Sequence, residues 1–553
     1  MTDRHAARAA VACGLVLTLA ACGEPPAKPT ASTGEARPAS AWRSETLVPP
    51  GPFHGIHGLA FDRDGRLLAG SVVGAAIYAV DPETGAVELF RGPPGGMADD
   101  IAVAPDGTLA WTGFLTGEVR VQPPEGEVRV VAEGLPGANS LAFTEDGRLF
   151  FTQVFLGDAL HEADPTGAEP PRLVLEDVGG LNGFDFGPDG HLYGPLWFRG
   201  AIARVDVDAA KLEVVAEGFA IPAAVNFDST GQLWAVDTKR GELLRVDLEG
   251  GEHEVVAAVA PAIDNLAIAP DDSVFLSNMA DNAILRVDPE TGETRTVVES
   301  ALAVAADVAL AEDGASLWVA DVFSLRRVNL ATGDVTEVAR QYADELENPL
   351  AVGVGHGRVA TTSWSAGVIQ LFDAASGESL GVHHDLPTPF DAVPLANGAV
   401  LFVDFAGGRL VRAEGEDLGT RTSLVEGLDA PVAVVHDGPD AVLVSEHGAG
   451  RILRVTLGDG RFAVLAEGLD GPEGVARAQD GSLLVAEVGA KRILRIDPED
   501  GSRTTLAADA PIGYPAPPGT PGAYVPTGVA AAGDGSVLFS SDVDAAIYRL
   551  RRD

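Results

Sequence analysis

The chain has 553 residues, 46% hydrophobic and 22% charged, which is the composition of a globular protein rather than a disordered one. Its 38 Lys and Arg residues are outnumbered by 81 Asp and Glu residues, and the resulting formal charge of −43 argues against nucleic acid as a partner. The same charge argues against adhesion to anionic lipid by electrostatics alone, while it is compatible with cation binding.

The N-terminus predicts export. Arg4 and Arg8 precede a short apolar run at residues 9–17, which is typical of a secretory signal and too short to span a membrane. Leu19-Ala20-Ala21-Cys22 is similar to the bacterial lipobox, which implies that residues 1–21 are removed and Cys22 is lipidated. An ordinary signal cut near Ala21 is the alternative.

The segment that follows predicts a tether. Residues 22–41 are rich in proline, as flexible linkers often are, and nothing after them approaches about 18 consecutive apolar residues. We therefore expect an extracytoplasmic protein of the cell envelope that meets the membrane through its lipid anchor only. In a Gram-negative cell, Gly23 after the lipidated cysteine favours the outer membrane.

From residue 58 onward the chain repeats one pattern about every 42 residues. A short apolar strand is followed by an Asp-Gly type of turn, a second strand and an Arg-Val-Asp type of strand, as in residues 58–70, 182–194 and 473–487. Repeats of about 40 to 50 residues with several strands each are the signature of propeller blades. The sequence predicts an all-β fold of twelve four-stranded blades.

The strand phase favours two six-bladed propellers over a single ring of twelve blades. The last repeat stops after its third strand, and a spare strand at residues 45–48 precedes the first repeat. We expect residues 42–293 to form the first propeller, with residues 45–48 completing its sixth blade. Residues 294–553 would form the second, with residues 294–298 completing its last blade. A longer repeat at residues 511–526 predicts either a binding loop or a packing loop.

Residues at the start of each inner strand converge on the central channel of a propeller. In the first six repeats this position is mostly polar, which suits a hard cation such as Ca²⁺, and its members are His57, Asp99, Asn139, Asn182, Ala223 and Asp264. In the second six repeats it is mostly apolar, and only Asp391 and Glu473 are carboxylates. We predict Asn139, Asn182, Asp264, Asp99 and His57 as candidate metal ligands, and Asp391 and Glu473 as candidate ligand-binding residues of the second channel.

The repeats NGFDFGPDGHLYG at Asn182 and PEGVARAQDGSLLVAE at Pro472 resemble blade motifs of the gluconolactonase/senescence marker protein family. The resemblance implies a six-bladed propeller with a divalent cation held in the channel by a Glu, two Asn and an Asp. Asn139 and Asn182 match the two Asn positions, but His57 and Ala223 stand at the Glu and Asp positions. Neither half of the chain keeps the full ligand set. NHL-type propellers share the same repeat pattern.

Two functions follow from these observations. The first is a lipid-anchored propeller that binds a small-molecule or protein ligand, with a divalent cation in the first channel. The second is a cation-dependent lactone or ester hydrolase like the gluconolactonases, in which the cation would polarise the substrate and a carboxylate or His57 would activate water. Lyase action is a weaker third reading, since no pair of catalytic histidines is apparent. The Glu446-His447 pair is expected to be incidental, and the aspartates at positions 237, 321, 404 and 542 are expected to hold turns.

Overall fold

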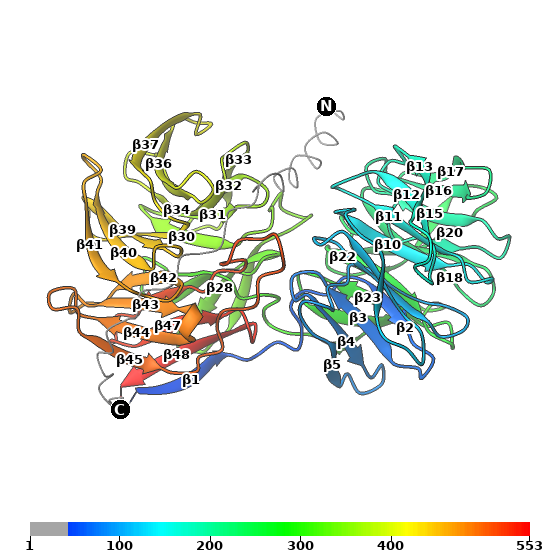
Figure 1. Ribbon diagram of the computed structural model, residues 1–553, viewed down its shortest axis with the longest axis horizontal. Coiled ribbons are helices and arrows are strands. Elements are labelled where there is room, and N and C mark those ends of the chain that lie inside the picture. The colour runs from blue at the N-terminus through cyan, green and yellow to red at the C-terminus, as the bar shows by residue number, and fades with distance from the viewer. Residues whose placement is uncertain (1–41, 553) are drawn as a thin grey trace.

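The computed structural model describes residues 42–552, so Cys22, the predicted signal and the predicted tether lie outside the described residues. The described chain forms twelve four-stranded antiparallel sheets, which pack as two six-bladed β-propellers lying side by side (Figure 1). Apart from a short 3-10 turn at Val488–Ala490, these residues contain no helix, and thus none able to cross a membrane. The predicted fold class is confirmed.

The first propeller, called ring one, is built from 24 consecutive strands. Its blades are β2 (Leu59–Phe61), β3 (Leu67–Ser71), β4 (Ala76–Val80) and β5 (Val87–Arg91); β6 (Ile101–Val103), β7 (Leu109–Gly113), β8 (Glu118–Gln122) and β9 (Arg129–Ala132); β10 (Ala138–Phe143), β11 (Leu149–Gln153), β12 (Ala159–Ala163) and β13 (Arg172–Glu176); β14 (Asp185–Phe186), β15 (Leu192–Leu196), β16 (Ala201–Asp206) and β17 (Lys211–Glu217); β18 (Pro222–Phe227), β19 (Leu233–Asp237), β20 (Glu242–Val246) and β21 (His253–Ala258); β22 (Ile263–Ile268), β23 (Val274–Asn278), β24 (Ala283–Val287) and β25 (Thr294–Val298).

The second propeller, called ring two, contains the remaining strands. Its blades are β26 (Val308–Leu310), β27 (Ser316–Ala320), β28 (Ser324–Asn329) and β29 (Val335–Arg340); β30 (Ala351–Gly355), β31 (Arg358–Ser363), β32 (Val368–Asp373) and β33 (Ser379–His383); β34 (Pro389–Pro394), β35 (Val400–Asp404), β36 (Arg409–Glu414) and β37 (Thr420–Glu426); β38 (Pro431–His436), β39 (Ala441–Glu446), β40 (Arg451–Thr456) and β41 (Phe462–Glu467); β42 (Pro472–Arg477), β43 (Leu483–Glu487), β44 (Arg492–Ile496) and β45 (Arg503–Ala507); β46 (Val529–Ala531), β47 (Val537–Ser541), β48 (Ala546–Arg552) and β1 (Trp42–Val48).

The turn between the first two strands of each blade has the conformation that the repeated glycine predicts. All ten repeated turn glycines have a positive φ, between 66° and 91°, which a side chain would strain: they are Gly65, Gly107, Gly147, Gly190, Gly231, Gly314, Gly357, Gly398, Gly481 and Gly535. In the two irregular copies, Asp272 and Gly438 take the left-handed conformation, with φ of 62° and 86°. Each repeat of the sequence is therefore one blade.

Ring one closes without exchanging a strand. Its first inner strand, β2, packs against β22 of its sixth blade. The segment that enters the ring supports this seam, since Phe53 and Ile56 are fully buried in the same apolar cluster as Phe275. Side-chain packing and the entering segment together join the first and sixth blades.

Ring two closes with the N-terminal strand, and the predicted strand exchange is wrong. β1 pairs antiparallel with β48, with Trp42 opposite Arg552 and Val48 opposite Ile547, so it completes the last blade. β25 pairs with β24 within its own blade. Consequently β1 belongs to ring two and β25 to ring one, which shifts the predicted ring boundaries of 42–293 and 294–553.

The turn before β25 gives the physical reason. Residues 288–292 read Asp-Pro-Glu-Thr-Gly, the same letters as residues 81–85 in the first blade. In both turns the aspartate accepts hydrogen bonds from the backbone N–H groups two and three residues later, at 2.8–2.9 Å. This tight hairpin returns β25 to β24, so the blade is filled locally and β1 is left for the only blade that lacks a fourth strand.

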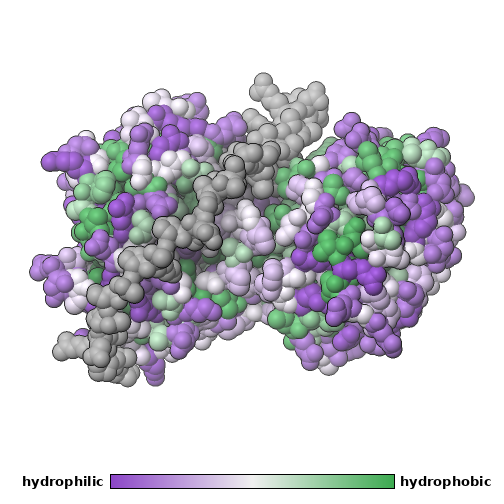
Figure 2. All heavy atoms as spheres, viewed as in Figure 1, coloured by the Kyte–Doolittle hydropathy of each residue, from purple (hydrophilic) through white to green (hydrophobic). Residues whose placement is uncertain are grey.

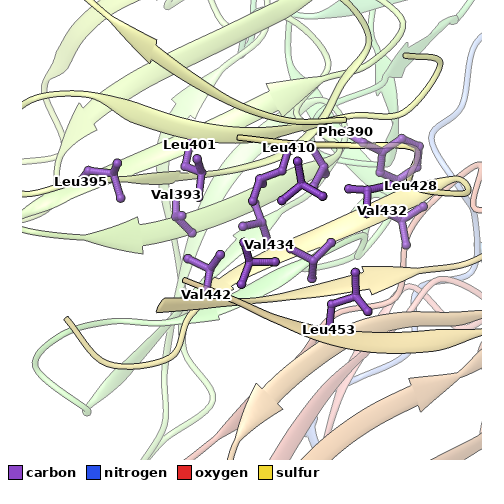
Figure 3. Packing of buried hydrophobic residues seen from close by; sticks show 14 of the residues in the cluster. Phe390, Val393, Leu395, Leu401, Leu410, Leu428, Val432, Val434, Val442 and Leu453 are labelled. Carbon is purple, nitrogen blue, oxygen red and sulfur yellow. The ribbon is translucent and has the colours of Figure 1, made fainter. Parts of the chain in front are cut away.

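The apolar cores lie between neighbouring blades. Most second strands are buried along their whole length, because each blade packs against the next on either side. Figure 3 shows one such cluster, in which Phe390, Val393 and Leu401 of one blade interdigitate with Val434 and Val442 of the next. With acidic side chains kept outside these cores, hydrophilic residues cover much of the outer surface of ring one, at the right in Figure 2.

The two rings are packed on each other near their channel mouths. An apolar cluster joins Met279 and Ala280 of ring one to Phe323, Leu350 and Tyr524 of ring two. The long loop at residues 511–526 takes part, since Tyr524 belongs to this cluster and the ring of Tyr514 lies 4.6 Å from that of His54. Of its two predicted roles, the structure shows packing between the rings.

Candidate functional site

The candidate metal ligands of ring one line the channel at the start of its inner strands. Asp99, Asn139 and Asp264 form one group, because Asn139 hydrogen-bonds the Asp99 carboxylate, which in turn is repelled by Asp264. Asn182 joins through Ser140, whose hydroxyl oxygen lies 2.9 Å from Asn139 Oδ1 and 2.8 Å from Asn182 Oδ1. The structure therefore brings four of the five predicted residues together.

His57 lies apart from this group. Its ring packs against Phe323 of ring two, with centroids 5.8 Å apart, and within residues 42–552 its side chain forms no hydrogen bond or ion pair with the channel carboxylates. Burial lowers the pKa of His57 to about 4, so it is neutral at physiological pH. A packing role at the interface between the rings describes it better than a ligand role.

Around Ser140, the group has more hydrogen-bond acceptors than donors. The Ser140 hydroxyl carries one hydrogen atom and lies between two amide oxygens, so it can donate to only one of them at a time. The orientation of Asn182 is fixed because its Oδ1 also accepts the Gly183 N–H at 2.9 Å, and that of Asn139 because its amide N–H donates to Asp99. At any moment, therefore, one of the two amide oxygens accepts no hydrogen bond from Ser140. An oxygen in this position is free to coordinate a cation.

A deeper layer of acidic groups was missed by the sequence analysis. Asp100 and Asp185 lie further along the inner strands, and each uses its carboxylate to join two adjacent blades. Asp100 accepts the N–H of Ile101 at 2.9 Å and that of Leu141 in the next blade at 3.4 Å. Their signal in the sequence is an acidic residue one or three positions after the predicted channel residue.

No cation compensates these carboxylates. Burial raises the pKa of Asp100 and of Asp264 to about 7, and it raises the pKa of Asp99 and of Asp185 as well. In the described chain, no Lys, Arg or His side chain forms an ion pair with any of the four. Buried carboxylates in such surroundings must take up protons or bind a metal ion.

Asp264 is the carboxylate with the most freedom to bind an ion. It accepts no hydrogen bond from any described residue, and its side chain keeps partial exposure to the channel. Residues 42–552 contain no group of three or more His, Cys, Asp or Glu side chains placed to hold a metal. An ion here would therefore need the amide oxygens of Asn139 and Asn182 beside Asp99 and Asp264, which is a donor set of the kind Ca²⁺ takes.

The predicted residues of the second channel join neighbouring blades. Asp391 accepts the N–H of Ala392 and that of Val434 in the next blade, both at 2.7 Å. Glu473 accepts the Thr527 N–H of the next blade at 2.7 Å, and its other oxygen lies 3.7 Å from His447 Nδ1. Asp307, which the sequence analysis missed, joins its blade to Val352 in the same way at 3.1 Å. Each of these carboxylates thus accepts a backbone N–H of the next blade.

The recurring aspartates after the second strands hold turns, as predicted. Asp237 accepts the N–H groups of Ala220 and Ile221, at 2.6 and 3.2 Å, and Asp321 and Asp542 bind the corresponding loops of their own blades. Glu446 does the same for Asp429 N–H, at 2.8 Å, which removes it from any pairing with His447.

Solved structures resemble this chain, but no protein family could be assigned to it. No family model matches the chain, and no curated protein matches its sequence. A gluconolactonase from Xanthomonas campestris is 16% identical, covering 45% of this chain and 96% of its own, with a TM-score of 0.36. The extracellular domain of a one-component system from B. thetaiotaomicron is 11% identical, covering 91% of this chain and 83% of its own, with a TM-score of 0.31. Similarity at this level says nothing about activity.

Proposed function

We propose that the chain is a ligand- or partner-binding double propeller of the cell envelope whose first channel holds a divalent cation such as Ca²⁺. The observation that carries the proposal is the pair Asp99 and Asp264, two deeply placed carboxylates that repel each other and have no cationic partner among the described residues. The lipobox-like residues ending at Cys22 support attachment by a lipid anchor.

The cation would neutralise the carboxylates and draw the inner strands of four blades together. Its donors come from the second, third, fourth and sixth blades of ring one, so one ion would link blades that are not all neighbours: Asp99, Asn139, Asn182 and Asp264. Hydrolysis of a lactone or ester remains the alternative. It would require a substrate to reach the ion, and the packing of ring two over the channel mouth favours binding over turnover.

Calcium titration of the purified full chain tests the proposal. After treatment with a chelator, we expect millimolar Ca²⁺ to raise the melting temperature, because an ion bound only by the folded state stabilises by about 2.7 kcal/mol at a hundred times its Kd. Asp264→Asn should abolish this gain. Metal analysis of the untreated protein should find a divalent ion in the wild type and not in the variant.

Asp307→Asn is the matched control. Asp307 is a buried channel carboxylate like Asp264, with its pKa also raised to about 7, but its oxygens accept backbone N–H groups in ring two. The calcium response of this variant should match that of the wild type. Wild-type protein without a calcium response, or Asp264→Asn with an unchanged one, would refute the proposed site.

A further inference from the structure

A loop of ring two reaches into the mouth of the ring-one channel. It comprises residues 341–350, between β29 and β30, and its second residue is Tyr342. The ring of Tyr342 meets that of Trp197 in ring one edge to face, with centroids 5.7 Å apart. Tyr342 also packs against the apolar cluster that contains Trp197 and Ala223. Ala223 is the small residue at the channel position of the fifth blade, so this side of the mouth is left open to an incoming side chain.

Tyr342 packs against the cluster that also contains Ile263, the residue before Asp264, so it lies beside the inner strand that carries this carboxylate. Burial raises the pKa of this phenol, and the nearby charges of Asp264 and Asp99 raise it further. The hydroxyl therefore stays protonated at physiological pH, and it offers both a hydrogen-bond donor for a carboxylate and an oxygen for a cation.

Arg340, which directly precedes this loop, anchors it to ring one by hydrogen bonds. Its side chain is only 6% exposed and donates to the Pro261 carbonyl at 2.9 Å and to Asp281 Oδ2 at 3.0 Å, both in ring one. Tyr342 itself has a φ of 70°, which is uncommon for a residue with a large side chain. A left-handed backbone at a large residue costs free energy and persists only where the surrounding structure holds it in place. Here the hydrogen bonds of Arg340, two residues away, hold the backbone.

We propose that Tyr342 is a residue of the ring-one ion site, contributed by ring two, so that the site is complete only when the two rings are docked. This inference rests on the proposed function, because it assigns a further group to the same cation. It also gives ring two a defined role, since its own channel carboxylates each accept a backbone N–H of the next blade.

Terbium luminescence tests the inference. Tb³⁺ is a hard cation that substitutes for Ca²⁺ in oxygen sites, and its emission is sensitised by an aromatic side chain close to the ion. The full chain should show sensitised Tb³⁺ emission that excess Ca²⁺ removes. Tyr342→Phe, which keeps the packing on Trp197, should lower the emission and weaken Ca²⁺ binding about two- to tenfold, as expected for one lost hydrogen bond or ligand. The melting temperature of the ion-free protein should change little.

Tyr524→Phe is the matched control, because Tyr524 is also a buried tyrosine at the interface between the rings, but its ring packs against Trp364 of ring two, with centroids 6.5 Å apart. It should leave both the emission and the affinity unchanged. Wild-type binding of Tb³⁺ and Ca²⁺ that Tyr342→Phe leaves intact would overturn the role of Tyr342 while the proposed function stands. Absence of ion binding in the wild type would overturn both.

Discussion

The channel carboxylates of this protein divide into two kinds according to what their oxygens accept. Five of them accept a backbone N–H group from the next blade, at 2.7–3.4 Å: Asp100, Asp185, Asp307, Asp391 and Glu473. Asp264 accepts none. A carboxylate that replaces a backbone carbonyl as acceptor is part of the scaffold, whereas one without donors has its oxygens available for an ion.

A pH-dependent stability follows for the scaffold carboxylates, and Asp307→Asn measures it. The pKa of Asp307 is raised by burial to about 7 from its ordinary 3.8. Folding therefore binds a proton between these values, so this contribution to stability is fully present below about pH 4, falls as the pH rises, and is lost above about pH 7. The variant cannot titrate at this position, and it relieves the repulsion that raises the pKa of Asp391.

Urea unfolding with a chelator at pH 5 and pH 8 gives the comparison. The free energy of unfolding of the wild type, taken relative to Asp307→Asn, should be about 1–3 kcal/mol lower at pH 8 than at pH 5. Parallel pH profiles for the two proteins would show that Asp307 does not titrate in this range.

The sequence predicts the positions of channel residues but not what they bind. Asp99, Asp264 and Glu473 occupy equivalent places in their repeats, whereas Asp391 stands one residue nearer the turn, at the place of Asp100 and Asp307. The difference depends on whether the carboxylate points along the sheet toward the next inner strand or into the channel, which one residue of register decides. Tyr342 could not be found at all, since its contact with ring one joins segments from different propellers.

Among the strands, the fold was predictable because nearly every blade is made of four consecutive strands. The turn glycines and the alternation of apolar residues act within about 42 residues, and both appear as expected. The destination of β1 was not predictable from strand phase, because a spare strand fits the open blade of either ring equally well. Only the hairpin before β25 separates the two solutions.

The pairing of β1 with β48 predicts which ring fails when β1 is disrupted. Ser44→Pro combined with Glu45→Pro removes two adjacent N–H groups, one of which must face β48, and this should destabilise ring two by about 3 kcal/mol or more. Pulse proteolysis with mass spectrometry should then release fragments of residues 308–552 first, with residues 59–298 still protected.

Arg43→Ala provides the control on the same strand, since the Arg43 side chain is 67% exposed and its loss leaves the backbone pairing intact. It should behave like the wild type. Early release of ring-one fragments from the proline variant would show instead that β1 supports ring one.

At the scale of the whole molecule, a buried ionic network holds the rings together. Arg340 binds Asp281 across the interface and Glu337 within ring two, while Arg326 donates to the Ala280 carbonyl at 2.6 Å. Charges buried at an interface stabilise one geometry, because any displacement leaves them unpaired. The network therefore fixes the orientation in which Tyr342 enters the channel.

Arg340→Met should loosen this docking at a cost of about 1–3 kcal/mol, since the partly exposed Asp281 and Glu337 keep some hydration. We expect two separate thermal transitions and a larger radius of gyration by small-angle scattering. Arg454→Met, which removes one of two arginine partners of Asp437 within ring two and leaves Arg477 bonded to it, should change neither property. A single transition and an unchanged radius in Arg340→Met would show that apolar packing alone holds the rings.

The strand that closes ring two is the first to be synthesised and the last to be used. β1 must wait for β48, since Val48 pairs with Ile547, roughly 500 residues later, and closing a loop of that length from an unfolded chain carries a large entropic cost. The folding of ring one removes most of this entropic cost, because it brings its own two ends together. Asn282 donates to the Phe53 carbonyl on the way into ring one, at 3.2 Å, and to the Leu302 carbonyl on the way out, at 3.4 Å. Once ring one has folded, β1 already stands beside the start of ring two. Ring one is thus a domain inserted into ring two, and its folding brings together the two ends that close ring two.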